Sequence, residues 1–143
     1  MSESSEHQEL VEELAEAVSC RWPAANVCWD SKWAGWGARR IRVGKYVPDV
    51  TAAQSKTGTL LAVGEAKRWD DIDNEHTGNQ LREWLRASRV PICLAMSRGC
   101  LERMEDTVEM ATGVESGGRI FIFDGLKWWT RRPGTLAAWR RER

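Results

Sequence analysis

Long apolar runs are absent from this sequence. No stretch of its 143 residues approaches the roughly 20 consecutive apolar residues that a membrane-spanning helix requires. The N-terminal segment is acidic and lacks the apolar core of a signal peptide. We therefore expect a cytoplasmic protein with no membrane partner.

Cysteine and histidine are scarce. The four cysteines form no CxxC pair, and the two histidines leave little material for a multi-histidine metal site. Cys28 and Cys93 lie in apolar stretches, so we expect buried thiols rather than disulfides. The sequence SKTGT at 55–59 holds the letters of a phosphate-binding loop, but in the wrong order and before a strand. No nucleotide cofactor is expected.

A net charge is also lacking, because 21 basic residues balance 21 acidic ones. The distribution is nevertheless uneven. Residues 21–48 hold six basic residues against Asp30 alone, and residues 127–143 hold six against Glu142, whereas residues 1–20 hold six acids and no Lys or Arg. Two basic segments in a neutral chain favour a surface that faces a polyanion. Ordinary solvated surface explains the same charges equally well, so charge alone does not decide.

The length suits one domain, 1–143. The spacing of apolar residues predicts a helix over 6–19, strands over 26–30, 39–53 and 59–67, a helix over 80–89, a strand over 90–97, a helix over 100–111, a strand over 119–125 with a hairpin partner at 126–130, and a short basic helix over 135–143. This order predicts an α/β fold with a mixed central sheet flanked by helices. The core would span about 6–97, and residues 98–143 would extend it.

Tryptophan is unusually frequent, with nine residues. Four are expected to serve packing, since a large aromatic side chain gains most when it is buried. The four expected in the core are Trp29, Trp69, Trp84 and Trp128.

Three charged residues stand out in the predicted hairpin VPDVTAAQSKTGTLLAVGEAK at 47–67. Glu65 and Lys67 are two apart on a strand, so their side chains leave the same face. If the hairpin folds about Thr57, Asp49 lies opposite Glu65, with Cβ atoms about 4.5–5.5 Å apart. A surface salt bridge between Glu65 and Lys67, with Asp49 at a strand end, is the structural alternative.

Two carboxylates so close repel each other unless a positive charge lies between them. Mg²⁺ meets this need, since it prefers one or two carboxylates together with water and phosphate oxygens, and Mn²⁺ is expected to replace it. The Ala66 backbone carbonyl would be a further ligand. Lys67 would then lie near the attacking water or the phosphate, where its charge aids hydrolysis.

This pattern resembles the PD-(D/E)XK nuclease superfamily. Pro48-Asp49 matches the PD, and Glu65-Ala66-Lys67 matches the (D/E)XK on the following strand. The αβββαβ order over about 6–97 is most similar to small archaeal and viral Holliday-junction resolvases. The resemblance implies metal binding by Asp49 and Glu65 and a catalytic role for Lys67.

The resemblance also implies two helical site residues. Gln80 opens the next predicted helix, where several branches of the superfamily carry an assisting glutamine. Members often add a glutamate from the first helix. In the resolvase pattern that position falls on His7, and the neighbouring Glu6 and the later Glu13 lie at the rim of the apolar stripe. We favour Glu6, with Glu13 as the alternative.

Basic and aromatic residues precede Pro48-Asp49. A DNA backbone at the metal would pass near them, and the tryptophans among them can stack on bases. A solvated strand face is the alternative for the basic residues. The set comprises Arg39, Arg40, Arg42 and Lys45, with Trp33 and Trp36 in the preceding glycine-bearing loop.

The sequence therefore predicts a Mg²⁺-dependent DNA endonuclease, structure-selective and acting as a homodimer, because a twofold protein presents two equivalent sites to a symmetric substrate. A restriction or repair nuclease with another DNA substrate is one alternative. The other is a module of the same fold that binds DNA or protein without cleavage.

Overall fold

Seven strands form one mixed sheet, and three helices cover it, in the residues that the structure describes. The structure is a computed structural model, and it describes residues 3–30, 40–113, 119–130 and 139–142. The elements are α1 Glu3–Arg21, β1 Ala25–Trp29, β2 Val50–Gln54, β3 Leu60–Lys67, α2 Glu75–Ala87, β4 Ile92–Met96, α3 Leu101–Thr112, β5 Ile120–Phe123, β6 Trp128–Thr130 and β7 Arg140–Arg141. This confirms the predicted single α/β domain with a mixed sheet.

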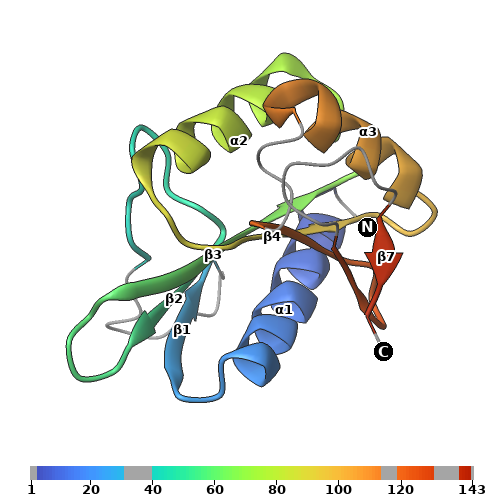
Figure 1. The fold of residues 1–143 in the computed structure, drawn as a ribbon. Coiled ribbons are helices and arrows are strands. Elements are labelled where there is room, and N and C mark those ends of the chain that lie inside the picture. Colours follow the sequence, from blue (N-terminus) through green and yellow to red (C-terminus); the bar gives the residue numbers. More distant parts are fainter. Residues whose placement is uncertain (1–2, 31–39, 114–118, 131–138, 143) are drawn as a thin grey trace.

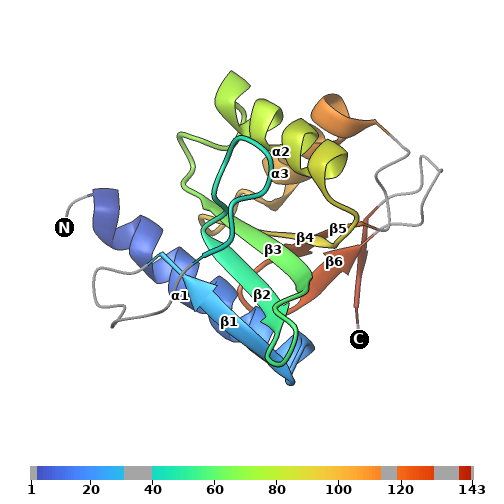
Figure 2. The ribbon, with the colours of Figure 1, turned by 90° about the vertical axis from the view of Figure 1, so that its left-hand side faces the viewer.

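The strands follow the chain order from β1 to β7 across the sheet. β1, β2 and β3 pair antiparallel, β3, β4 and β5 pair parallel through helical crossovers, and β5, β6 and β7 return to antiparallel pairing. Helix α1 lies on one face of the sheet, and α2 and α3 lie together on the other (Figures 1 and 2). No helix of the described residues is long and apolar enough to cross a membrane.

Helix α1 lies close to the sheet because the strands present small side chains to it. Leu10, Val11, Leu14 and Val18 form the buried stripe of the helix. Opposite them lie Ala52, Ala62, Ala66, Cys93 and Ala95, together with Gly64. A Cβ atom at Gly64 would lie 3.0 Å from Leu14 Cδ2 and 3.1 Å from Val50 Cβ. The helix therefore rests almost on the backbone of β3, and its first turns reach the end of that strand.

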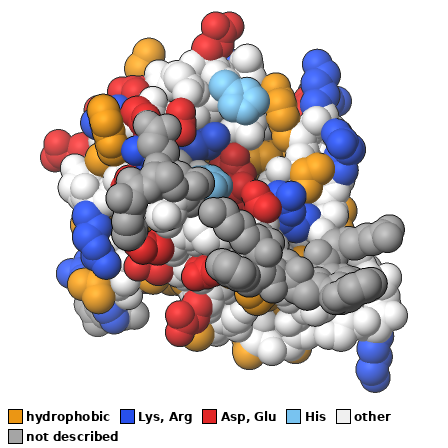
Figure 3. Space-filling model, turned by 180° about the vertical axis from the view of Figure 1, so that it is seen from behind, with side chains coloured by type: hydrophobic (Ala, Val, Ile, Leu, Met, Phe, Trp, Pro, Cys, Tyr) orange, Lys and Arg blue, Asp and Glu red, His pale blue; other side chains and the backbone are white. Residues whose placement is uncertain are grey.

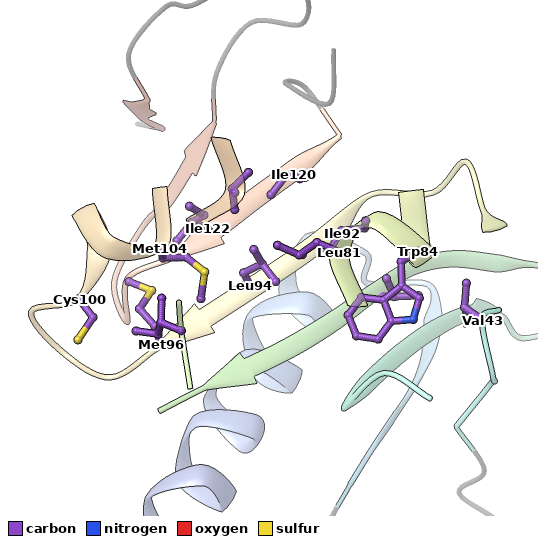
Figure 4. Close-up of a cluster of buried hydrophobic side chains, with 13 residues drawn as sticks. Val43, Leu81, Trp84, Ile92, Leu94, Met96, Cys100, Met104, Ile120 and Ile122 are labelled. Atoms are coloured by element: carbon purple, nitrogen blue, oxygen red, sulfur yellow. The ribbon is translucent and has the colours of Figure 1, made fainter. Parts of the chain in front are cut away.

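The opposite face carries the larger core (Figure 4). Trp84 and Leu81 from α2 and Met104 from α3 are fully buried against the sheet, where Ile92 and Leu94 of β4 meet them. Helix α2 begins after Asn74, whose side chain accepts a hydrogen bond from the Thr77 amide. Such a cap satisfies one amide that the first turn leaves unpaired, and it fixes where α2 starts relative to β3.

Three of the predicted elements differ from the structure. The strand expected over 39–53 begins only at Val50, because the described residues before it form a tight turn with an isolated Val43–Tyr46 bridge. Gly44 in this turn has φ +62, a conformation that glycine favours. The helix expected over 80–89 begins five residues earlier, at Glu75. Arg140–Arg141 form strand β7 and not the expected terminal helix; residues 135–138 lie outside the described part.

The predicted core tryptophans divide into three groups. Trp84 is fully buried, and Trp29 and Trp128 are half-buried against the α1 core. The prediction for Trp69 was wrong, because 55% of its surface is exposed. It follows β3 directly, where the chain leaves the sheet and the alternation of the strand no longer applies.

Gly64→Val should destabilise the fold. The Cβ of the added side chain would lie 3.0 Å from Leu14 and 3.1 Å from Val50, closer than ordinary van der Waals contact, and overpacking of this kind costs about 1–3 kcal/mol of unfolding free energy. Urea unfolding would measure it, with Ala53→Val on the half-buried end of β2 as the control. Equal stability of Gly64→Val and the control would show that α1 does not rest on β3 as described.

Candidate active site

Asp49 and Glu65 lie opposite each other where β2 begins and β3 ends. Val50 pairs with Gly64, so the register places Asp49 across from Glu65. The Asp49 amide donates a hydrogen bond to Glu65 Oε1 at 3.0 Å, and the Ala66 amide donates one to Asp49 Oδ2, also at 3.0 Å. Both residues are buried, with 8% and 5% of their surfaces exposed. Two carboxylates are thus enclosed at one end of the sheet.

Lys67 and Gln80 complete a chain of polar contacts from this pair. Lys67 Nζ lies 3.2 Å from Glu65 Oε2 and donates a hydrogen bond to Gln80 Oε1 at 2.5 Å. Both side chains are buried. Gln80 lies in the second turn of α2, which the Asn74 cap positions over the end of β3. The structure therefore brings together Asp49, Glu65, Lys67 and Gln80.

The two carboxylates have opposite pKa shifts. Burial and, after it, the negative charge of Asp49 raise the pKa of Glu65 to about 8, against the opposing effect of Lys67. Burial opposes ionisation of Asp49 too, but hydrogen bonds from His7 and the Ala66 amide outweigh it and leave the pKa of Asp49 below its usual value. At neutral pH the pair therefore shares a single proton, held by Glu65. One bound cation can replace that proton.

His7 and Asp30 extend the site on the far side of Asp49. His7 Nε2 lies 3.6 Å from Asp49 Oδ1, and the hydrogen bond with Asp49 raises the pKa of His7 against the opposing effect of its burial. The Asp30 amide donates a hydrogen bond to the Asp49 carbonyl at 2.8 Å. Ligand atoms of His7, Asp30 and Asp49 lie within 4.8 Å of one another. With His7 at Oδ1 and the Ala66 amide at Oδ2, both carboxylate oxygens of Asp49 have a polar partner.

Sequence reasoning did not assign His7 or Asp30 to the site. Asp30 reaches the site through strand pairing, because β1 pairs with β2 and Trp29 lies opposite Val50, which sets Asp30 opposite Asp49; no pattern in the sequence indicates that register. His7 stands at the position where the resolvase pattern has its glutamate, whereas the helical wheel favours its neighbour Glu6. One residue along a helix is a turn of about 100°, which is enough to select a different neighbour.

The two helix glutamates make other contacts. Glu6 accepts hydrogen bonds from Ser97 Oγ and from Arg68 Nε, the latter at 3.2 Å, and these lower its pKa. Glu13 is half-exposed and lies 3.8 Å from Arg98. The structure thus brings His7, and not Glu6 or Glu13, to Asp49.

The predicted DNA contacts lie partly within the described residues. Arg40 donates a hydrogen bond to the Pro48 carbonyl at 3.2 Å and lies 3.8 Å from Asp30, so it borders the site. Arg42 and Lys45 are exposed in the turn that packs on α2. Figure 3 shows acidic side chains gathered on this side of the molecule beside a histidine, with basic side chains around them. Arg39, Trp33 and Trp36 lie outside the described residues.

The donor set fits a hard divalent cation. Carboxylate oxygens of Asp49 and Glu65 are the ligands that Mg²⁺ and Mn²⁺ prefer, and a nearby imidazole favours Mn²⁺ over Mg²⁺. Ala66, whose carbonyl was predicted as a ligand, lies directly beside the pair, since its amide already contacts Asp49.

Comparisons with protein-family models, curated proteins and solved structures found no match for this chain.

Glu65→Gln should change how stability depends on pH. The pKa of Glu65 is about 8 in the folded protein against 4.5 for a free glutamate, so its protonated form is favoured by folding. That contribution is complete below the unfolded pKa and is lost as the pH rises through about 8. Urea unfolding in EDTA should show wild type losing stability as the pH rises from about 5 to about 9, with a smaller loss in Glu65→Gln.

The control for this measurement is Glu109→Gln, an exposed position on α3. This variant should show the wild-type dependence of stability on pH, because it leaves both Glu65 and His7 unchanged. If Glu65→Gln and wild type lose stability in parallel, Glu65 does not hold the proton.

Proposed function

We propose that this protein is a metal-dependent endonuclease of the PD-(D/E)XK type, which hydrolyses DNA phosphodiester bonds. The observation that carries the proposal is the buried pair Asp49–Glu65 with an ammonium group 3.2 Å away. A structural salt bridge does not need a second buried carboxylate, and burying one is costly. A cation-binding centre can use both carboxylates as ligands.

Each residue has a defined part in this proposal. Asp49 and Glu65 would hold Mg²⁺ or Mn²⁺ with the Ala66 carbonyl, and the bound ion would stabilise negative charge on the phosphate and acidify a water. Lys67, held by its hydrogen bond to Gln80, would place its positive charge beside the phosphoryl oxygens. His7 would orient Asp49 through the contact at Oδ1. Water would attack phosphorus in line, leaving a 5′-phosphate and a 3′-hydroxyl, as the resemblance implies.

The substrate is proposed from charge and from the resemblance. Arg40 borders the site, and Arg42 and Lys45 are exposed on the turn before it. These cations would neutralise backbone phosphates, which supplies affinity without sequence choice. The resemblance to Holliday-junction resolvases directs the proposal to branched DNA cut by a homodimer.

Asp49→Asn and Lys67→Gln should abolish DNA cleavage. Each removes one charge from the centre while nearly preserving shape, and we expect at least about a hundredfold loss of rate, the usual scale for removing a preorganised group from an active site. The measurement is cleavage of labelled four-way junction, linear duplex and single-stranded DNA with Mg²⁺ or Mn²⁺. Circular dichroism would verify that the variants are folded.

The matched control for Lys67→Gln is Lys56→Gln, an exposed lysine in the β2–β3 turn. It should cleave at the wild-type rate. Cleavage that persists in Asp49→Asn would contradict the proposal. DNA binding without metal-dependent cleavage in wild type would favour a non-catalytic module.

Mg²⁺ or Mn²⁺ should raise the melting temperature of wild type. A ligand that binds only the folded state at a hundred times its dissociation constant adds about 2.7 kcal/mol of stability. Asp49→Asn should show no rise, whereas Asp70→Asn, an exposed acid outside the pair, should respond like wild type. An equal rise of the melting temperature in both variants would show that the cation binds elsewhere.

A further inference from the structure

A groove runs between α1 and the hairpin of β5 and β6, on the face of the sheet opposite α2 and α3. Helix α1 packs against β1 to β4, so the hairpin beyond it leaves Phe123 and Trp128 half-exposed on this face. Two hollows of about 440 and 490 Å³ lie here. They share Glu13, Phe123 and Gly125 and therefore adjoin.

The groove combines an apolar floor with a raised apolar tip. Leu10 and Ala17 of α1 and the rings of Phe123 and Trp128 line the floor. Leu126, at the hairpin turn, is 74% exposed. Leu126 lines the second hollow together with Phe123 and Trp128, and a contiguous exposed apolar patch is typical of a contact surface.

The exposed leucine is held in place. Asp124 Oδ1 accepts hydrogen bonds from the Leu126 and Lys127 amides, each at 2.8 Å, and Asp124 Oδ2 accepts one from Trp129 Nε1 at 2.7 Å. The turn that presents Leu126 is therefore fixed before any partner arrives. A preorganised contact loses less entropy on binding than a flexible one.

The rim of the groove is acidic. Six acids line it against the two cations Arg98 and Lys127; the acids are Glu6, Glu9, Glu13, Glu16, Asp124 and Glu142. Some of them are already paired, Glu13 with Arg98 and Glu142 with Arg21. Glu9 and Glu16 are exposed and form no ion pair with any residue that the structure describes.

This charge selects the kind of partner. DNA would be repelled, and two copies related by a twofold axis through the groove would oppose like charges. A cationic segment with an apolar face matches both the rim and the floor. From Glu6 to Cys20, helix α1 offers about 21 Å of groove wall, which is the length of a helix of about 14 residues.

We propose that this groove binds a basic amphipathic helix of a partner protein. The apolar side chains of that helix pack on Phe123, Leu126 and Trp128, and its Lys and Arg side chains pair with Glu9 and Glu16. The binding does not depend on the proposed nuclease activity, since none of these residues belongs to the site of Asp49 and Glu65.

The test uses a synthetic helix as the probe. A 14-residue peptide with leucine at every third or fourth position and lysine at the others presents the required face. Two control peptides are a scrambled sequence of the same composition and a version with glutamate in place of lysine. Fluorescence anisotropy measures binding to the full-length protein in about 0.15 M salt.

We expect saturable binding of the amphipathic basic peptide, at least tenfold tighter than binding of either control peptide. Leu126→Ser and the double variant Glu9→Lys/Glu16→Lys should each weaken it at least tenfold. All three positions are exposed, so the fold should tolerate the changes. The matched controls on α3 are Met110→Ser, at an 88% exposed apolar residue, and Asp106→Lys/Glu109→Lys. These should bind like wild type.

Three results of the peptide-binding measurement would overturn the proposal. They are no saturable binding up to about 1 mM, equal weakening by the groove variants and the α3 controls, and equal affinity for the scrambled peptide. The last two would show charge attraction without a site. Self-association of the protein alone that Leu126→Ser abolishes would likewise overturn it, because the groove would then be occupied by a second copy.

Discussion

Two buried carboxylates, with one buried lysine in contact with Glu65, are the constraint on which this structure depends. Asp49 and Glu65 would repel each other in a plain hairpin, and burial makes the repulsion stronger. The fold offsets it locally, through the Ala66 amide, the Asp49 amide, Lys67 and His7. Even with these contacts, the pair still carries a proton at neutral pH. That residual demand for positive charge is the basis of the proposed metal centre.

The surrounding architecture brings α1, the start of β2, the end of β3 and α2 together at this site. The parallel β3–β4 pair requires a crossover, and the crossover helix α2 delivers Gln80 to Lys67. On the other face, the small residues of β3 and β4 let α1 lie close enough for His7 to contact Asp49. A larger residue at Gly64 would press on Leu14 of α1, the helix that also carries His7. Packing in the core and the geometry of the site are therefore coupled.

The central part of the site could be predicted from the sequence because it depends on local rules of strand geometry. Glu65 and Lys67 share a face by alternation, and a hairpin centred on Thr57 sets Asp49 against Glu65. The observed register agrees there, although pairing shifts between Ala52 and Ala53 near the turn. Gln80 was expected to open a helix and lies instead in its second turn, because the Asn74 cap starts α2 earlier.

What the sequence could not supply depends on tertiary distances. The choice of His7 over Glu6 rests on how deeply α1 sits on the sheet, which no single helical wheel reveals. The contact between Asp30 and Asp49 needs the register of β1 against β2. The exposure of Trp69 and the strand at Arg140–Arg141 depend on where the chain leaves the sheet and returns to its edge. Such features follow from the assembled fold and not from periodicity.

The most direct measurement is a crystal structure of the protein grown with Mn²⁺, with anomalous diffraction recorded for the metal. The account predicts one anomalous peak in contact with carboxylate oxygens of both Asp49 and Glu65, with Lys67 displaced from Glu65 Oε2. The contrary result is a well-diffracting crystal, grown in saturating Mn²⁺, with no peak at the pair and the Glu65–Lys67 contact unchanged. That result would contradict the claim that the pair is a cation site.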